Sequence, residues 1–169
     1  MDLRNAIRDI PDFPHEGILF RDITPILQDG ALLRAALDQF AELAAKYEFD
    51  VIAGPESRGF IFGVPLAVML GKGFVPIRKS GKLPYTTVKK SYDLEYGSAT
   101  IEMHTDAVKP GERVLVVDDL LATGGTARAT VDLIEKAGAQ VAASLFLIEL
   151  SFLEGRKGIK GPVEVIVAY

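Results

Sequence analysis

The run from Val114 to Thr126 constrains this chain more than any other stretch. Four apolar residues are followed by the adjacent carboxylates Asp118 and Asp119, then by a short loop with hydroxyls and two glycines, and then by apolar residues at helical spacing. An apolar run of this kind is typical of a strand buried on both faces, as in a parallel sheet. The pattern therefore predicts a strand, a turn and a helix. Both acids should leave the carboxyl end of the strand, toward different sides, where open α/β sheets bind ligands.

The loop over residues 122–126 predicts an anion site. Gly124 and Gly125 let the backbone turn tightly, and the helix behind them offers unpaired N–H groups and the positive end of its dipole. The hydroxyls of Thr123 and Thr126 can add donors. The loop is not a Walker A motif, since no lysine follows the glycines, and it lacks the glycine spacing of dinucleotide-binding loops. A loop without its own cation suits a phosphate monoester.

The two acids add a second function to this loop. Carboxylates repel phosphate, but they can accept hydrogen bonds from a vicinal diol, or they can hold a metal. A phosphate site beside a diol acceptor indicates a ribose 5-phosphate site. The alternative is a structural turn with solvated acids, although two adjacent acids at the end of a buried strand carry a desolvation cost that a structural turn leaves unexplained.

Length and composition favour one soluble globular domain. The chain has 169 residues, a net charge of −4 and no cysteine, which excludes a disulfide framework and a cysteine nucleophile. The longest apolar stretch, residues 59–70, is shorter than the about 20 residues that span a bilayer, and the N-terminus lacks a signal-peptide core. We therefore expect a cytoplasmic protein, and the acidic balance argues against broad nucleic-acid binding.

Hydrophobic spacing predicts the order of the elements. A short amphipathic helix is expected over 2–10, an extended segment over 17–25, and a helix over about 30–47 that Asp29 caps. Strands are expected over 50–53, 74–78, 114–117, 139–149 and 163–168, with helices up to about 70 and from about 127 to 137. The alternating residues between 79 and 105 indicate an antiparallel hairpin inserted between two core strands. This order implies βαβ units and a parallel sheet.

A second turn, from Gly54 to Gly59, repeats the arrangement of a strand end and a helix start. It is a second anion position, to which Arg58 adds a planar fork suited to phosphate oxygens. Its alternative is a surface loop with an incidental arginine. The basic residues Arg78, Lys79 and Lys82 favour diphosphate neutralisation, whereas Lys89 and Lys90 favour a solvated hairpin that avoids edge pairing.

Together these features resemble a known family. The run from Val114 to Thr126 resembles the phosphoribosyl diphosphate (PRPP) signature of the type I phosphoribosyltransferases. The segments 18–25, 78–84 and 91–97 resemble those of the adenine phosphoribosyltransferases, and the likeness extends from Asp12 to about Gly158. It implies a single α/β domain over 1–169, with a Rossmann-like parallel sheet flanked by helices. It also implies a small hood from residues of about 1–28 and 150–160, and a flexible hairpin lid over about 79–105.

The resemblance assigns roles to individual residues. The ribose 5-phosphate would be bound by Asp118, Asp119, Ala122, Thr123, Gly124, Gly125 and Thr126, and the diphosphate by Ser57, Arg58, Arg78, Lys79, Lys82 and Tyr96. Adenine would lie on Phe20, with backbone groups of Leu19 and Arg21 reading its edge and Leu153 closing the other face. Taken alone, Phe20 and Leu153 are better explained as core packing. Glu95 and Arg58 would be the catalytic residues, and one peptide bond, Glu56–Ser57, would be cis.

The implied activity is transfer of the phosphoribosyl group from PRPP to adenine. Mg²⁺ would be carried mainly by substrate and water, with no metal ligands from the protein, and a homodimer is implied. His15 and His104 have no ligand-spaced partner. Two other classes compete. A receiver domain also pairs acids after a strand, but places them early in the chain, and a PRPP-sensing regulator would need a helix-turn-helix or a basic face.

Overall fold

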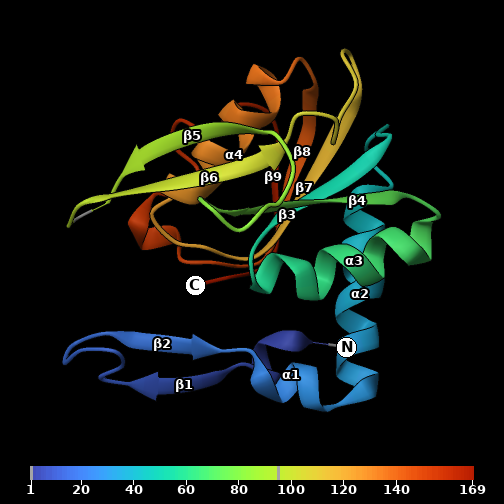
Figure 1. Ribbon diagram of the computed structural model, residues 1–169. Helices are drawn as coiled ribbons and strands as arrows, with labels where there is room; N and C mark the ends of the chain where they lie inside the picture. The colour runs from blue at the N-terminus through green and yellow to red at the C-terminus, as the bar shows by residue number, and fades with distance from the viewer. Residues whose placement is uncertain (1, 95) are drawn as a thin grey trace.

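A seven-stranded sheet with helices on both faces organises the computed structural model, which describes residues 2–94 and 96–169 (Figure 1). The strands are β1 (Arg8–Pro11), β2 (Leu19–Asp22), β3 (Val51–Pro55), β4 (Gly73–Lys79), β5 (Thr87–Asp93), β6 (Ser98–His104), β7 (Arg113–Leu121), β8 (Gln140–Glu149) and β9 (Val163–Ala168). The α-helices are α1 (Thr24–Gln28), α2 (Gly30–Ala44), α3 (Arg58–Leu70) and α4 (Gly125–Lys136), and η1 (Leu3–Ala6) and η2 (Ser151–Leu153) are 3₁₀ turns.

The order of the strands is that of an open, doubly wound α/β sheet. The sheet runs β5-β6-β4-β3-β7-β8-β9, and the five strands from β4 to β9 in that order are parallel. The chain passes from β3 to β4 on one side and returns to β7 on the other. The gap between the carboxyl ends of β3 and β7 is therefore the topological switch point, where such sheets bind ligands. The predicted fold class is confirmed.

Strand β7 is buried on both faces, as its sequence predicted. Leu115 and Val117 pack with residues of α2 and α3, among them Phe40 and Phe62. Val114 and Val116 face the other way, toward α4 and the hairpin of β5 and β6, where Leu133 and Met103 complete a second core. Because side chains alternate along a strand, each helical layer covers one set of alternating apolar residues.

The helix boundaries follow the expected capping chemistry. The carboxylate of Asp29 accepts hydrogen bonds from the N–H groups of Ala31 and Leu32, which begins α2 as predicted. Helix α3 ends at Gly71, whose φ of 65° lies in the left-handed region that glycine adopts without strain. Helix α2 ends at Ala44, a few residues before the expected boundary, because the chain turns there toward β3.

The prediction of a helix over residues 2–10 is wrong beyond its first turn. Only Leu3–Ala6 form a 3₁₀ turn, and residues 8–11 form β1, which pairs antiparallel with β2 so that Ile10 lies opposite Phe20. The apolar spacing of this segment spans too few turns to stabilise a helix by itself. The backbone instead finds partners in β2, a contact that the local pattern does not encode. This small sheet lies apart from the main one (Figure 1).

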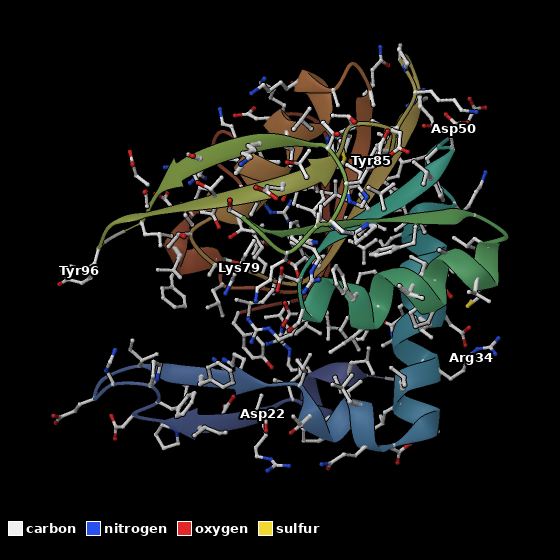
Figure 2. The ribbon with its side chains drawn as sticks, viewed as in Figure 1. Asp22, Arg34, Asp50, Lys79, Tyr85 and Tyr96 are labelled. Atoms are coloured by element: carbon white, nitrogen blue, oxygen red, sulfur yellow. The ribbon has the colours of Figure 1, made fainter. Side chains whose placement is uncertain are left out.

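The expected hairpin insert is confirmed as β5 and β6, which are antiparallel from Thr87 opposite His104 to Asp93 opposite Ser98. Strand β6 continues the main sheet through Arg78 and Lys79 of β4. Strand β5 lies against α4. Tyr96, at the far tip, points away from the body of the protein (Figure 2) and is 88% exposed. Among the described residues, no helix is long and apolar enough to cross a membrane.

Candidate active site at the switch point

A notch opens between β3 and β7 because their pairing stops early. The two strands are paired only as far as Ala53 and Val116, whereas β7 stays paired with β8 up to Leu121. Asp118 and Asp119 therefore lie inside β7 rather than beyond its end, which corrects the expectation that they leave the strand. They do lie past the end of the β3 pairing, so their side chains are at the mouth of the notch.

The turn after β3 closes tightly over this notch. A Cβ atom at Gly54 would lie 2.9 Å from the carbonyl oxygen of Val117, and one at Gly59 would lie 3.0 Å from the same oxygen. Both positions therefore require glycine for a steric reason. The Glu56–Ser57 peptide bond in this turn is cis, as the family resemblance implied.

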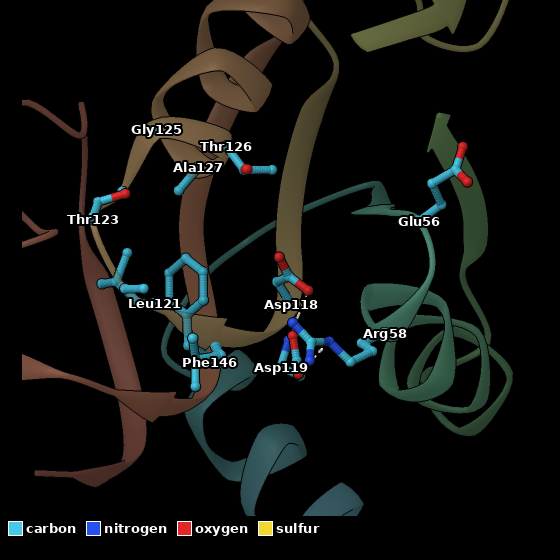
Figure 3. A pocket seen from close by; sticks show the side chains of 13 residues that line it. Glu56, Arg58, Asp118, Asp119, Leu121, Thr123, Gly125, Thr126, Ala127 and Phe146 are labelled. Atoms are coloured by element: carbon cyan, nitrogen blue, oxygen red, sulfur yellow. Dashed lines mark hydrogen bonds and ion pairs between the residues drawn. The ribbon is translucent and has the colours of Figure 1, made fainter. Parts of the chain in front are cut away.

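The close approach brings Arg58 to the acids. Its Nε lies 3.0 Å from Oδ2 of Asp119, so the start of α3 and the end of β7 are joined by an ion pair. Figure 3 shows the acids between Arg58 on one side and the turn of Thr123 to Thr126 on the other. Oδ1 of Asp118 accepts a hydrogen bond of 2.8 Å from the N–H of Asp119. Asp119 is 4% exposed.

Burial makes both acids unusual. Removal from water raises the pKa of Asp118 well above its ordinary value, and the neighbouring charge of Asp119 raises it further. Burial also raises the pKa of Asp119, although the guanidinium of Arg58 acts in the opposite direction. A buried carboxyl group with few partners is costly to the fold, and such perturbed acids are typical of functional sites.

The turn of Ala122–Thr126, called the glycine turn below, faces the two acids across one cavity of about 240 Å³. Gly124 has a φ of 84°, and α4 begins directly after it with no side chain capping its first N–H groups. Those groups remain available to an anion, as the sequence predicted. The cavity is lined by Arg58, Asp118, Asp119 and Ala122–Thr126, together with Glu56, Leu120, Leu121, Ala127 and Phe146.

Two residues that support the turn from behind were not identified from the sequence. Arg128 donates hydrogen bonds to the carbonyl oxygens of Thr123 (3.1 Å) and Lys157 (2.9 Å). Gly155 lies so close to the turn that a Cβ there would be 2.2 Å from the carbonyl oxygen of Ala122. The position of Arg128 one turn into α4 was a usable signal for the first contact. The contact between Gly155 and Ala122 depends on the tertiary structure alone, and no sequence signal indicates it.

A second cavity, of about 440 Å³, adjoins the first and shares Glu56 and Thr126 with it. Arg78 and Lys79 line it, as does Tyr92 of β5. Glu56 was also missed by the sequence reasoning, although it lies in the turn that this reasoning singled out. Its Oε1 accepts hydrogen bonds from Nε of Arg78 (3.2 Å) and from the backbone N–H of Lys79 (2.7 Å).

A third cavity, of about 430 Å³, lies between β2 and the start of α3 and shares Arg58 with the first. Phe20 and Arg21 line it, and the ring of Phe20 meets that of Phe13 edge to face at 5.1 Å. An aromatic ring beside an arginine and a polar notch suits a flat heterocycle. Arg58 is thus the point at which the two cavities meet.

The N-terminal hairpin is tied to the segment after β8 through Tyr169. The guanidinium of Arg21 lies 3.7 Å from the centroid of the Tyr169 ring, and Arg21 also pairs with Asp9. The N–H of Ser151 donates to the Tyr169 carbonyl oxygen at 2.8 Å. The two segments that sequence reasoning assigned to a hood therefore contact a common residue.

Several predicted site residues lie outside the described walls of these cavities. Ser57 lies between two lining residues, and Leu19 and Leu153 are 45% and 39% exposed on the segments expected to hold adenine. Lys82 is exposed, and its backbone carbonyl oxygen accepts a hydrogen bond from Arg78. Tyr96 is at the hairpin tip, and Glu95 lies outside the residues that the structure describes. Within residues 2–94 and 96–169, no three acidic, histidine or cysteine side chains form a metal-binding cluster.

Comparison with known proteins gives one consistent result. Residues 23–163 match the family called phosphoribosyl transferase domain. The adenine phosphoribosyltransferase of Kosmotoga olearia is 54% identical over the whole of both chains. The crystal structure of the adenine phosphoribosyltransferase of Thermoanaerobacter pseudethanolicus superposes with a TM-score of 0.96, at 48% identity over 99% of this chain and 98% of that one.

A third likeness includes bound ligands. The Saccharomyces cerevisiae adenine phosphoribosyltransferase, solved with adenine and an imino-altritol bisphosphate, is 43% identical with a TM-score of 0.93, over 97% of this chain and 96% of that one.

Proposed function

Because this chain belongs to the adenine phosphoribosyltransferase family, we propose that it transfers the 5-phosphoribosyl group of PRPP to N9 of adenine, giving AMP and diphosphate. The observation that carries the proposal is a single cavity in which the buried Asp119 and the partly exposed Asp118 face an uncapped helix start across a glycine turn. That pairing suits a sugar with hydroxyls at one end and a phosphate at the other. The yeast relative crystallised with adenine and a bisphosphate supports the same pair of substrates.

The 5-phosphate of PRPP would bind in the turn of Ala122–Thr126. The N–H groups at the start of α4 point into this turn, and the dipole of a three-turn helix favours an anion there. Gly155 and Arg128 hold the turn from behind, so its shape exists before the ligand arrives. Preorganised donors do not have to be ordered on binding, which preserves affinity.

The ribose hydroxyls would bind Asp118 and Asp119. Each ionised carboxylate is an acceptor only, so it complements hydroxyl donors. Ion pairing with Arg58 holds the Asp119 carboxylate in place. With the phosphate and the diol both held, C1 of the ribose has a fixed position, which is the condition for transfer to a second bound substrate.

The diphosphate would leave toward Ser57, Arg58, Arg78 and Lys79, with Lys82 and Tyr96 contributing from the hairpin segment. Arg58 borders the first cavity and Arg78 and Lys79 border the second, so positive charge extends from C1 along the path of departure. Glu56 holds Arg78 and the backbone of Lys79 in this position. Positive charge aimed at a departing anion stabilises the transition state, which has oxocarbenium character in glycosyl transfer.

Enzymes of this family generally use Mg²⁺ with PRPP, and the site fits an ion carried by the substrate. The cavity offers the adjacent carboxylates of Asp118 and Asp119, its third carboxylate, Glu56, is hydrogen-bonded to Arg78 and Lys79, and the described residues include no cluster of three ligands. Substrate oxygens and water would complete the shell, as Mg²⁺ prefers. When bound, the ion neutralises charge on the diphosphate.

Adenine would lie in the third cavity, on the ring of Phe20. The strand β2 offers backbone groups of Leu19 and Arg21, and adenine needs one acceptor and one donor on its amino edge. Leu153 would close the opposite ring face from η2, which Tyr169 ties to the same hairpin. Residues of about 1–28 and 150–160 would together form the hood.

Glu95 would act as the general base for the purine proton, and the hairpin of residues 79–105 would close over the site. This role follows from the family resemblance, since Glu95 lies outside the described residues. Closure would exclude water, which otherwise hydrolyses PRPP. Strand β5 itself is held against α4.

A homodimer in the cytoplasm completes the proposal. Val64 and Val68 lie one turn apart on α3 and are 42% and 77% exposed, an apolar surface that a second copy could cover. The absence of cysteine suits a reducing compartment. Sedimentation velocity on the wild type and on Val68→Asp tests the assembly: a wild-type monomer would reject it.

The test of the activity is release of diphosphate that depends on both adenine and PRPP. Competition between adenine, hypoxanthine and guanine then measures base choice. We expect AMP as the product and a strong preference for adenine. Diphosphate release without adenine, or equal use of guanine, would contradict the proposal.

A further inference from the structure

Tyr92 of the inserted hairpin reaches the start of α4. Its hydroxyl lies 3.0 Å from the hydroxyl of Thr126, the last residue of the glycine turn. Its ring also covers Gly125, since a Cβ built there would lie 3.5 Å and 3.6 Å from two ring carbons. The contact joins residues 34 positions apart, and no sequence motif predicts it.

The position of Tyr92 does not depend on the hairpin tip. Lys90, two residues earlier in β5, pairs with Asp132 of α4 at 3.3 Å, and Lys136 donates to the carbonyl oxygen of Lys89 at 3.1 Å. Strand β5 is therefore attached to α4 over several residues. The phenol is presented to Thr126 by a fixed strand.

Hydroxyl chemistry gives this contact a direction. A threonine hydroxyl carries one proton and two lone pairs. If Thr126 donates its proton to Tyr92, it presents only lone pairs to an anion in the turn. If Tyr92 donates instead, the Thr126 proton is free for a phosphate oxygen, and the acceptance of one bond strengthens the donation of the next.

We propose that Tyr92 is a positioning residue that orients the Thr126 hydroxyl as a donor to the 5-phosphate. The inference rests on the proposed function and adds a residue to it that does not touch the ribose phosphate itself. Binding of the phosphate selects the state in which Tyr92 is the donor. The hairpin is thereby coupled to occupancy of the turn.

Tyr92→Phe tests this directly, because it removes one oxygen and keeps the ring over Gly125. The Kd for ribose 5-phosphate, measured by calorimetry, should rise about tenfold, a change of about 1.4 kcal/mol. The KM for PRPP should rise by a similar factor, while the KM for adenine stays unchanged. Tyr85→Phe is the matched control: Tyr85 precedes the same hairpin, is 61% exposed and has its ring against His104, so the control should bind ribose 5-phosphate normally.

A double-mutant cycle separates orientation of Thr126 from general damage. In a Thr126→Val background the phenol has no hydroxyl to orient, so Tyr92→Phe should then change the Kd less than twofold. In a Thr126→Ser background the hydroxyl is restored and the tenfold effect should return. An equal effect of Tyr92→Phe in all three backgrounds would overturn the inference.

Two outcomes separate a failure of the role of Tyr92 from a failure of the proposed function. If the wild type binds ribose 5-phosphate and Tyr92→Phe binds it equally well, only the role of Tyr92 is rejected. If the wild type neither binds ribose 5-phosphate nor releases diphosphate from PRPP and adenine, the proposed function fails and this inference fails with it.

Discussion

The Arg58 guanidinium and the Asp119 carboxylate form an ion pair of 3.0 Å that spans the switch point of the sheet. Arg58 begins α3, after β3, and Asp119 lies in β7, which is 61 residues later in the sequence. The pair joins the start of α3 to β7. Asp119 is the acid that is paired in this way, whereas Asp118 is a partly desolvated carboxyl group with a raised pKa, which the fold tolerates at a cost.

Asp118→Asn should stabilise the fold while weakening the binding of PRPP. The folded pKa of Asp118 is raised, so between the unfolded and folded pKa values the native state binds the extra proton, and stability falls as pH rises through that window. Removing the charge should therefore raise the free energy of unfolding at neutral pH. Urea unfolding at several pH values measures this.

The same variant should bind PRPP at least about tenfold more weakly, because an amide accepts hydrogen bonds from the diol less well than a carboxylate. Asn can still accept from the N–H of Asp119, so the local backbone contact is preserved. A destabilised variant with normal PRPP affinity would refute both the buried charge and the diol role.

Gly155→Ala should displace the glycine turn. Its Cβ would lie 2.2 Å from the carbonyl oxygen of Ala122, and a backbone atom cannot move aside cheaply. We expect a loss of about 2 kcal/mol in stability, within the usual cost of overpacking, and weaker PRPP binding. Gly30→Ala is the matched control, since it meets no atom within 4 Å at the start of α2 and should be neutral or slightly stabilising. Thermal unfolding and PRPP titration of both variants decide the matter.

Phe20→Ala should raise the KM for adenine much more than the KM for PRPP. The ring lines the cavity beside Arg58 and contacts Phe13, and it does not line the cavity of the glycine turn, so its loss should leave that turn intact. Loss of an aromatic stacking surface typically costs about 1–3 kcal/mol, which is about fivefold to about 150-fold in affinity. Equal increases for both substrates would instead indicate general destabilisation of the N-terminal hairpin.

Arg156→Ala should destabilise the segment after β8. Nε and Nη2 of Arg156 bind the two oxygens of Glu149 at 2.6 Å and 2.8 Å, and Glu149 is 5% exposed. Loss of the arginine leaves a buried carboxylate unpaired, at a cost of about 2 kcal/mol, below the range for a fully buried pair because Arg156 is half exposed. Lys157→Ala, which breaks the exposed pair with Glu154, should cost less than about 0.5 kcal/mol. Chemical denaturation of both variants compares the two pairs, and equal losses would contradict the argument.

Glu95→Gln should lower kcat by about a hundredfold with little change in either KM, as expected for loss of a general base. The variant keeps the size of the side chain and removes its basicity. The pH–rate profile of the wild type should show an acidic limb, and that limb should be absent from the profile of the variant. Unchanged turnover would remove Glu95 from the chemistry.

Most of the site could be predicted from sequence because its chemistry is local. The acids, the glycine turn and the helix behind them are contiguous, so residue order alone placed an uncapped helix start beside two adjacent carboxylates. The same is true of Arg58 in its turn, and of Asp29 at its helix start. Periodicity failed at residues 8–11, where the deciding partner was another strand.

The sequence by itself therefore determined two things: the apolar run that buries β7 on both faces, and the types of hydrogen-bond donor and acceptor at the end of that strand. The tertiary structure alone decided which segments meet there: Arg58 with Asp119, Gly155 with Ala122, Tyr92 with Thr126 and Tyr169 with Arg21. The physical reason is range. Periodicity in the sequence reports which face of a strand or helix is buried. Which distant residue a side chain contacts depends instead on how the whole sheet is wound.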